Sequence, residues 1–271
     1  MQSLRNLALA GAVALALVPA AARGADLPVP PPMFRAPIVE EYGAWYLRGD
    51  IGITNQQVKK LDSPAFTPTV TVLEKGFESA GLFDVGIGYR FNNWLRCDVT
   101  GEYRANSTFH GLDRFPNATP PPATSTNQYT GVKSEWLFLF NAFLDLGTWH
   151  SVTPFVGAGV GFDRLTIGNF TDVNIQNVAL GWSPDNSKWN FAWALHAGLA
   201  YQVTPNFAVE LAYRYVDLGN GATKDLLAPD GTNAVFNPIL FKHVTSNDIK
   251  LGVRWMFADT FFPEPPLVRK Y

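Results

Sequence analysis

The chain has 271 residues, of which 47% are hydrophobic, 14% aromatic and 16% charged, and its formal net charge is −2. A mean hydropathy near zero excludes a bundle of membrane-spanning helices, because each such helix needs about 20 consecutive apolar residues. The aromatic content excludes a disordered chain, and the balanced charge gives no reason to expect nucleic acid as a partner.

The first 24 residues have the pattern of a secretory signal peptide. Arg5 provides a positive charge, residues 7–18 form an apolar run, and Ala22 and Gly24 are the small residues of a cleavage site. A buried N-terminal helix is the alternative interpretation. We expect residues 1–24 to be removed and residues 25–42 to form a proline-rich periplasmic leader. The single cysteine, Cys97, excludes an intramolecular disulfide.

Eight runs in which polar and apolar residues alternate follow this leader. Phe83 and Val85, for example, share one face, while Asp84 and Gly86 share the other. A period of two residues predicts β-strands. The predicted strands are residues 43–54, 81–91, 94–105, 135–146, 153–163, 189–203, 207–218 and 247–257.

The connections between these strands alternate in length. Short ones are expected at residues 92–93, 147–152 and 204–206. Long polar ones are expected at about residues 55–80, 106–134, 164–188 and 219–246. This alternation is typical of outer-membrane barrels, which have short periplasmic turns and long extracellular loops. The fold class we expect is therefore all-β: an eight-stranded antiparallel up-and-down transmembrane β-barrel over residues 43–257, followed by a short C-terminal extension, residues 258–271.

The chemistry of the two faces favours a membrane barrel over a soluble one. A soluble barrel is apolar inside, whereas a membrane barrel turns its apolar face to lipid. The polar face mixes charge with glycine, which suits a crowded interior better than a solvated surface. A simple hydrophobic core remains the alternative for the aromatic residues. We expect two aromatic girdles at the membrane surfaces, formed by Trp45, Tyr89, Phe91, Tyr103, Trp136, Phe162, Phe191, Trp193, Tyr201, Phe207, Tyr215, Trp255 and Phe257.

Four segments carry a resemblance to a known family. They are NAFLDLG (residues 141–147), TPFVGAGVGF (153–162), LAYRYVDLG (211–219) and SNDIKLGVRWMF (246–257). In their order and spacing they resemble the small eight-stranded outer-membrane surface proteins of Gram-negative bacteria, the opacity-type and surface-antigen relatives of the outer-membrane protein A barrel. The leader ADLPVPPP resembles alphaproteobacterial members. The chain departs from the family by continuing past Phe257, the aromatic residue that usually ends the last strand and is read by the barrel-assembly machinery.

The inward face is expected to hold a network of ion pairs. Buried charges must be paired, and eight strands enclose only enough room for side chains. We therefore expect a filled lumen, with a narrow ion-conducting channel as the alternative. The charged residues assigned to this network are Arg48, Asp50, Asp84, Arg90, Arg96, Asp98, Glu102, Arg104, Glu135, Asp145, Glu210, Arg214, Asp248, Lys250 and Arg254.

No catalytic, cofactor or metal site is predicted. The four histidines, His110, His150, His196 and His243, show no spacing typical of a triad or a metal site. A lipid A-modifying enzyme is the less favoured alternative. We expect a monomeric outer-membrane protein that supports envelope integrity and contacts lipid and lipopolysaccharide. The long loops are where an extracellular partner would be recognised, with a mobile surface as the alternative. They contain scattered aromatic residues: Phe109, Phe115, Tyr129, Phe170, Trp182 and Phe236.

Overall fold

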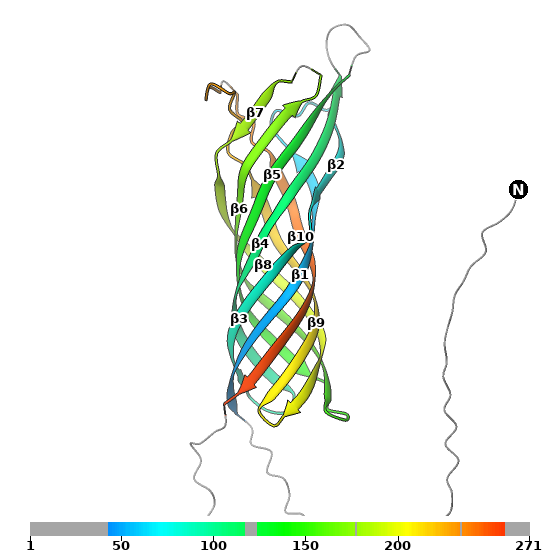
Figure 1. The fold of residues 1–271 in the computed structure, drawn as a ribbon, viewed down its shortest axis with the longest axis vertical. Coiled ribbons are helices and arrows are strands. Elements are labelled where there is room, and N and C mark those ends of the chain that lie inside the picture. The colour runs from blue at the N-terminus through cyan, green and yellow to red at the C-terminus, as the bar shows by residue number, and fades with distance from the viewer. Residues whose placement is uncertain (1–42, 117–123, 177, 234, 258–271) are drawn as a thin grey trace, which may run out of the picture. The chain divides into compact units, whose positions relative to one another are not determined.

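The structure, a computed structural model, describes residues 43–116, 124–176, 178–233 and 235–257. In these residues the regular elements are β-strands that wind obliquely around a common axis (Figure 1). No helix among them is long and apolar enough to cross a membrane. The strands are β1 (Ala44–Asp62), β2 (Thr71–Phe77), β3 (Ala80–Arg90), β4 (Leu95–Pro116), β5 (Thr124–Asp145), β6 (Val152–Asn174), β7 (Leu180–Ser183), β8 (Asn186–Thr204), β9 (Phe207–Ala222) and β10 (Leu240–Met256).

Eight of these strands close into a ring by antiparallel pairing. The order around the ring is β1, β3, β4, β5, β6, β8, β9 and β10, and the pairing of β10 with β1 closes it. The short strands β2 and β7 pair with the far ends of β4 and β6, so that each continues the line of the strand that follows it. The predicted eight-stranded antiparallel up-and-down barrel is thus confirmed.

The two ends of the barrel differ in their connections. Residues 91–94, 146–151 and 205–206 join neighbouring strands at one end, and the long connections lie at the other. Here the predicted boundaries are wrong, because several strands run deep into segments expected to be loops. β1 continues to Asp62, β4 to Pro116 and β6 to Asn174, while β5 begins at Thr124. The barrel wall is therefore much taller than the alternating apolar pattern indicates.

The strand extensions were missed because the two faces exchange their chemistry along each strand. The end of the barrel with the short connections is called the lower end here, and the opposite end the upper end. In the lower part of β1, Leu47 and Ile51 are exposed and Arg48 is buried. In its upper part, Lys59 is exposed while Val58 is buried. An exterior that is apolar against lipid and polar against water accounts for this exchange. The upper barrel consequently has an apolar interior.

Three of the aromatic residues assigned to surface loops belong to this upper interior. Phe109, Tyr129 and Phe170 are each 1% exposed. Their placement in long loops is wrong, because they lie on β4, β5 and β6 and point into the barrel above the membrane. Trp182 and Phe236 are exposed.

Several sequence predictions fall on residues outside those that the structure describes. These are the signal peptide (1–24), the leader (25–42) and the C-terminal extension (258–271).

Candidate functional site

The structure buries fourteen of the fifteen charged residues assigned to the lumen. They come from β1, β3, β4, β5, β9 and β10, because the alternation of each strand turns every second side chain inward, and β6 and β8 contribute none of them. The exception is Arg90, which is half-buried beside a short turn, where its Nε donates to the carbonyl oxygen of Asn92 at 3.0 Å. Arg90 does not join the network.

The upper part of the network is centred on Arg104 of β4. Its guanidinium contacts Glu102 at 3.1 Å, Glu135 at 3.0 Å and Asp248 at 3.0 Å. Arg214 of β9 shares two of these carboxylates, because its Nη2 lies 2.6 Å from both Glu102 and Asp248. Two arginines and three carboxylates thus tie β4, β5, β9 and β10 together across the lumen.

The middle of the network is formed by Lys250 and Arg48. Lys250 forms ion pairs with Asp84 and, at 2.8 Å, with Asp50. Arg48 contacts Asp50 at 2.6 Å and Asp98 at 3.1 Å. Asp50 therefore connects two cations from different strands, which is how a buried carboxylate offsets the cost of losing water.

The lower part of the network lies nearer the short turns. Arg96 contacts Asp145 at 3.1 Å and Glu210 at 3.7 Å, and Arg254 contacts Glu210 at 3.0 Å. The Arg96 guanidinium also lies 4.3 Å from the ring centroid of Phe143. A cation over an aromatic face is attracted by the negative ring surface. This end of the lumen is therefore occupied by both rings and ion pairs.

Three lumenal residues were absent from the predicted network. Lys133 is 1% exposed and lies 2.6 Å from Glu135. Asp163 is fully buried, and neither of its carboxylate oxygens has a hydrogen-bond partner among the described residues. His196 is buried, with its Nε2 3.2 Å from the Asn141 side chain oxygen. The two-residue period could have found Lys133, because it precedes Glu135 on the same face.

Apolar side chains fill the lumen above and below the charges. At the lower end, Phe143 and Phe155 pack with Ala200 and Ala212. Glycine makes room for these rings: a Cβ at Gly198 would come within 2.6 Å of Phe155. At the upper end lies a larger cluster, here called the upper plug. Its members are Val58, Leu61, Phe109, Tyr129, Leu137, Leu139, Leu165, Ile167, Phe170, Ala192, Ala194, Val216, Leu218, Leu226, Ile239, Phe241 and Val244.

All thirteen residues assigned to the aromatic girdles are exposed or half-exposed on the barrel. Several meet across neighbouring strands. Trp45 and Tyr89 lie near the short turns with ring centroids 5.3 Å apart, and Tyr103 and Trp136 lie further up the wall at 5.0 Å. This placement suits rings at the two surfaces of a membrane.

The histidines are dispersed over the barrel. His196 is in the lumen, whereas His110 is exposed on β4, with its Nε2 3.2 Å from Glu78. His150 and His243 have positive φ angles, 49° and 53°, at a turn and at an irregularity of β10. Among the residues that the structure describes, no three His, Cys, Asp or Glu side chains are placed to hold a metal ion.

Comparison with known proteins gives the family. The chain matches the family described as outer membrane protein beta-barrel domain over residues 7–257. It is 28% identical to an uncharacterized protein of Brucella suis over 220 residues, covering 74% of this chain and 77% of the other. It is 26% identical over 219 residues to a "Putative adhesin" of Rickettsia massiliae, covering 78% and 87%.

The outer membrane protein PagN of Salmonella typhimurium is 26% identical over 181 residues, which cover 64% of this chain and 71% of that protein. Among solved structures, Neisserial surface protein A is 19% identical, covers 80% of this chain and 100% of its own, and gives a TM-score of 0.42. OprG of Pseudomonas aeruginosa is 13% identical, with coverage of 80% and 96% and a TM-score of 0.48. The chain belongs to the outer membrane protein beta-barrel domain family and is a protein of the bacterial outer membrane.

Proposed function

We propose that this protein is a closed, non-enzymatic barrel that supports envelope integrity and presents its extracellular end to partners outside the cell. The observation that carries this proposal is the filling of the lumen at every level. Ion pairs occupy the level of the membrane, and the upper plug lies between them and the extracellular end.

A conducting path would have to break these contacts. An ion entering from outside would first have to part the upper plug, in which Phe109, Phe170 and Phe241 are no more than 1% exposed. It would then meet Arg104, whose three carboxylate partners lie within 3.1 Å. Apolar packing and paired charges of this kind favour a structural role over transport.

The tall extracellular wall supports the second half of the proposal. Paired strands hold it, because β4 and β5 remain paired up to Pro116 and Thr124. A rigid base of this kind positions the connections at its rim for contact with a partner. Trp182 and Phe236 are exposed there, and aromatic side chains are enriched where proteins bind each other. The name of the Rickettsia relative, which contains the word adhesin, is consistent with such contact.

The outer surface of the barrel at membrane level supports a monomer embedded in lipid. The exposed apolar band below the upper girdle, with Leu47, Ile51 and Phe140 among its members, would face membrane lipid and lipopolysaccharide. We propose a monomer that the barrel-assembly machinery inserts, as the closed ring leaves no unpaired strand edge at membrane level.

The decisive experiment compares adhesion and conductance. Cells producing the wild-type protein should bind to immobilised extracellular matrix, and the variant Trp182→Ser/Phe236→Ser should bind less. A mobility shift between unheated and boiled samples verifies that both proteins fold. The purified wild type should give no steady conductance in planar bilayers. Conductance steps that disappear in Glu102→Gln would overturn the closed barrel, and altered lipid A in producing cells would overturn the non-enzymatic role.

A further inference from the structure

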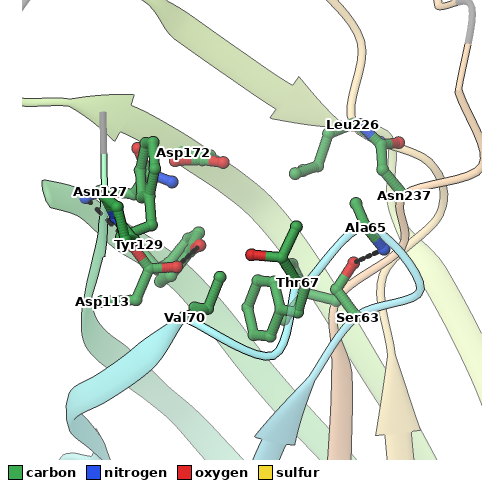
Figure 2. A pocket seen from close by; sticks show the side chains of 14 residues that line it. Ser63, Ala65, Thr67, Val70, Asp113, Asn127, Tyr129, Asp172, Leu226 and Asn237 are labelled. Carbon is green, nitrogen blue, oxygen red and sulfur yellow. Dashed lines mark hydrogen bonds between the residues drawn. The ribbon is translucent and has the colours of Figure 1, made fainter. Parts of the chain in front are cut away.

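A pocket of about 280 Å³ opens at the extracellular end, on top of the upper plug. Figure 2 shows it between the segment that follows β1, which carries Ser63 to Val70, and the ends of β4, β5 and β6. The connection between β9 and β10 closes it with Leu226 and Asn237. Five parts of the chain therefore form a cavity close to the lower end of the size range of small-molecule sites.

One side of the pocket is acidic. Asp113 of β4 is 1% exposed and accepts a hydrogen bond of 2.5 Å from the Tyr129 hydroxyl and one of 3.3 Å from the backbone N–H of Asn127. Asp172 of β6 lies on the same side in Figure 2. Asp172 is half-buried, and no hydrogen bond or cation among the described residues lowers the pKa of its carboxyl.

The remaining surface of the pocket is apolar or neutral. Phe66, Val70, Phe115, Leu226 and Ile239 are the large apolar residues of the lining, and none of the fourteen described lining residues is a lysine, arginine or histidine. An apolar cavity with a few converging polar groups is the usual form of a small-ligand site. The charge of this site is negative, and its shape suits a compact apolar body.

We propose that this pocket binds a small organic cation that carries an ammonium group on a compact apolar body. The ammonium would lie between Asp113 and Asp172, and the apolar body would pack against Phe66 and Phe115. Charge-assisted hydrogen bonds to ionised carboxylates are the strong class of polar contact. A bare metal ion fits less well, because only two of the lining residues carry a carboxylate, and no group of three His, Cys, Asp or Glu among the described residues could hold an ion.

The titration of the two carboxylates supports the proposal. Both lie beyond the membrane level, since Asp113 follows Tyr103 by ten positions on β4 and Asp172 follows Phe162 by ten on β6. Burial and the charge of Asp113 raise the pKa of Asp172 to about 7, and burial raises the pKa of Asp113. Tyr129 is the third titratable group facing the pair, and its pKa is raised as well.

A bound cation would relieve the repulsion between these carboxylates. It would stabilise ionised Asp172 and lower its pKa, so that binding near neutral pH releases protons. Linkage then requires the affinity to rise with pH through the range in which Asp172 loses its proton. A merely apolar ligand would show no such dependence.

The test uses 2-phenylethylamine as probe and 2-phenylethanol as its neutral counterpart of similar shape. Both are titrated calorimetrically into the mature chain, folded in a zwitterionic detergent. At about pH 8 the amine, an ammonium under these conditions, should bind one to one and at least roughly tenfold more tightly than the alcohol. At about pH 5.5 its affinity should fall, because Asp172 is then protonated.

Two variants make the test specific. Asp172→Asn should weaken binding of the amine by roughly tenfold to a hundredfold at about pH 8 and abolish the pH dependence. Asp230→Asn removes a carboxylate of the same extracellular end that does not line the pocket, and it should bind as the wild type does. Equal affinity for amine and alcohol, or an unchanged affinity in Asp172→Asn, would overturn the proposal. These measurements on purified protein are independent of the adhesion proposed above.

Discussion

Arg104 and Asp248 are separated by 144 positions in the sequence and form a two-pronged ion pair across the lumen. Arg104 Nη1 and Nη2 each lie 3.0 Å from a different oxygen of the Asp248 carboxylate. β3 and β1 stand between their strands, β4 and β10, in the ring, so the pair spans the interior of the barrel. It fixes the distance between two walls as well as neutralising two buried charges.

Removing Arg104 should destabilise the barrel strongly. Arg104→Leu leaves Asp248, Glu102 and Glu135 with fewer cationic partners in a buried place. Breaking a buried ion pair from one side typically costs about 3–5 kcal/mol. The free energy of unfolding, measured by urea titration of tryptophan fluorescence in detergent, should fall by that order. Arg104→Lys should lie between this variant and the wild type, because lysine retains the charge but not the two-pronged geometry.

The control for this prediction is an exposed ion pair. Lys60 lies 3.0 Å from Asp62, and its side chain is 62% exposed. Lys60→Met should change the free energy of unfolding by less than about 1 kcal/mol. A loss in Arg104→Leu no larger than that in Lys60→Met would contradict the importance of the lumenal network.

Replacing Asp163 should stabilise the barrel, whereas replacing a paired carboxylate should destabilise it. Its side chain is fully buried, and its oxygens have no hydrogen-bond partner among the described residues. An ionised group in this situation carries an uncompensated cost of desolvation. Asp163→Asn should therefore raise the free energy of unfolding by about 1 kcal/mol or more. The matched substitution Asp248→Asn, at a carboxylate held by two arginines, should lower it. Losses of similar size in both variants would show that Asp163 is also paired.

The position of each glycine relative to the barrel wall should decide whether it tolerates a larger residue. A Cβ at Gly157 would collide with the ring of Phe143, whereas a Cβ at Gly49 would meet only the backbone oxygen of Asp84, at 3.7 Å. Gly157→Leu should cost at least about 1–3 kcal/mol through overpacking. Gly49→Leu should be close to neutral, because its side chain points away from the lumen. Both variants are compared by the fraction of protein that shows heat-modifiable mobility after refolding. Equal folded fractions for Gly157→Leu and Gly49→Leu would contradict the close packing of Gly157 against Phe143.

How much of this fold the sequence predicts depends on the medium outside each strand. Where lipid surrounds the barrel, the sequence predicts all eight ring strands, although the alternation is weaker in β5, where Leu137, Leu139 and Phe143 also face the lumen. Above the girdle, water replaces lipid, so the exposed face becomes polar and the buried face apolar. The alternation in β1 continues through Val58 and Lys59, but with its meaning reversed. A search for one apolar face therefore ends too early, and register irregularities such as that between Arg104 and Ser107 shift the phase further.

The lumenal network, too, could be predicted only in part from the sequence. Alternation places Arg48, Asp50 and Arg104 on the polar face of their strands, and the mixture of charge and glycine on that face assigns it to the inside. Their partners depend on strand register and on contacts across the lumen, which no local pattern contains. The extracellular pocket could not be predicted for the same reason, since Asp113 and Asp172 lie on strand extensions that were read as loops.

The acidic pair of the pocket should make the stability of the ligand-free protein depend on pH. The pKa of Asp172 in the folded protein, about 7, exceeds the value of about 3.9 expected for an unfolded chain. Between these values the folded state binds more protons than the unfolded state, so its stability falls as the pH rises. Asp172→Asn cannot ionise and escapes this loss. The variant should thus unfold at a higher urea concentration than the wild type at about pH 8, and the difference should shrink towards about pH 4.

Asp230→Asn should give no gain at about pH 8, because hydrogen bonds from Thr232 lower the pKa of Asp230 and favour its ionised form. If Asp172→Asn raised the urea concentration of unfolding by the same amount at both pH values, the gain would come from packing. Asp113 would then not be repelling an ionised Asp172.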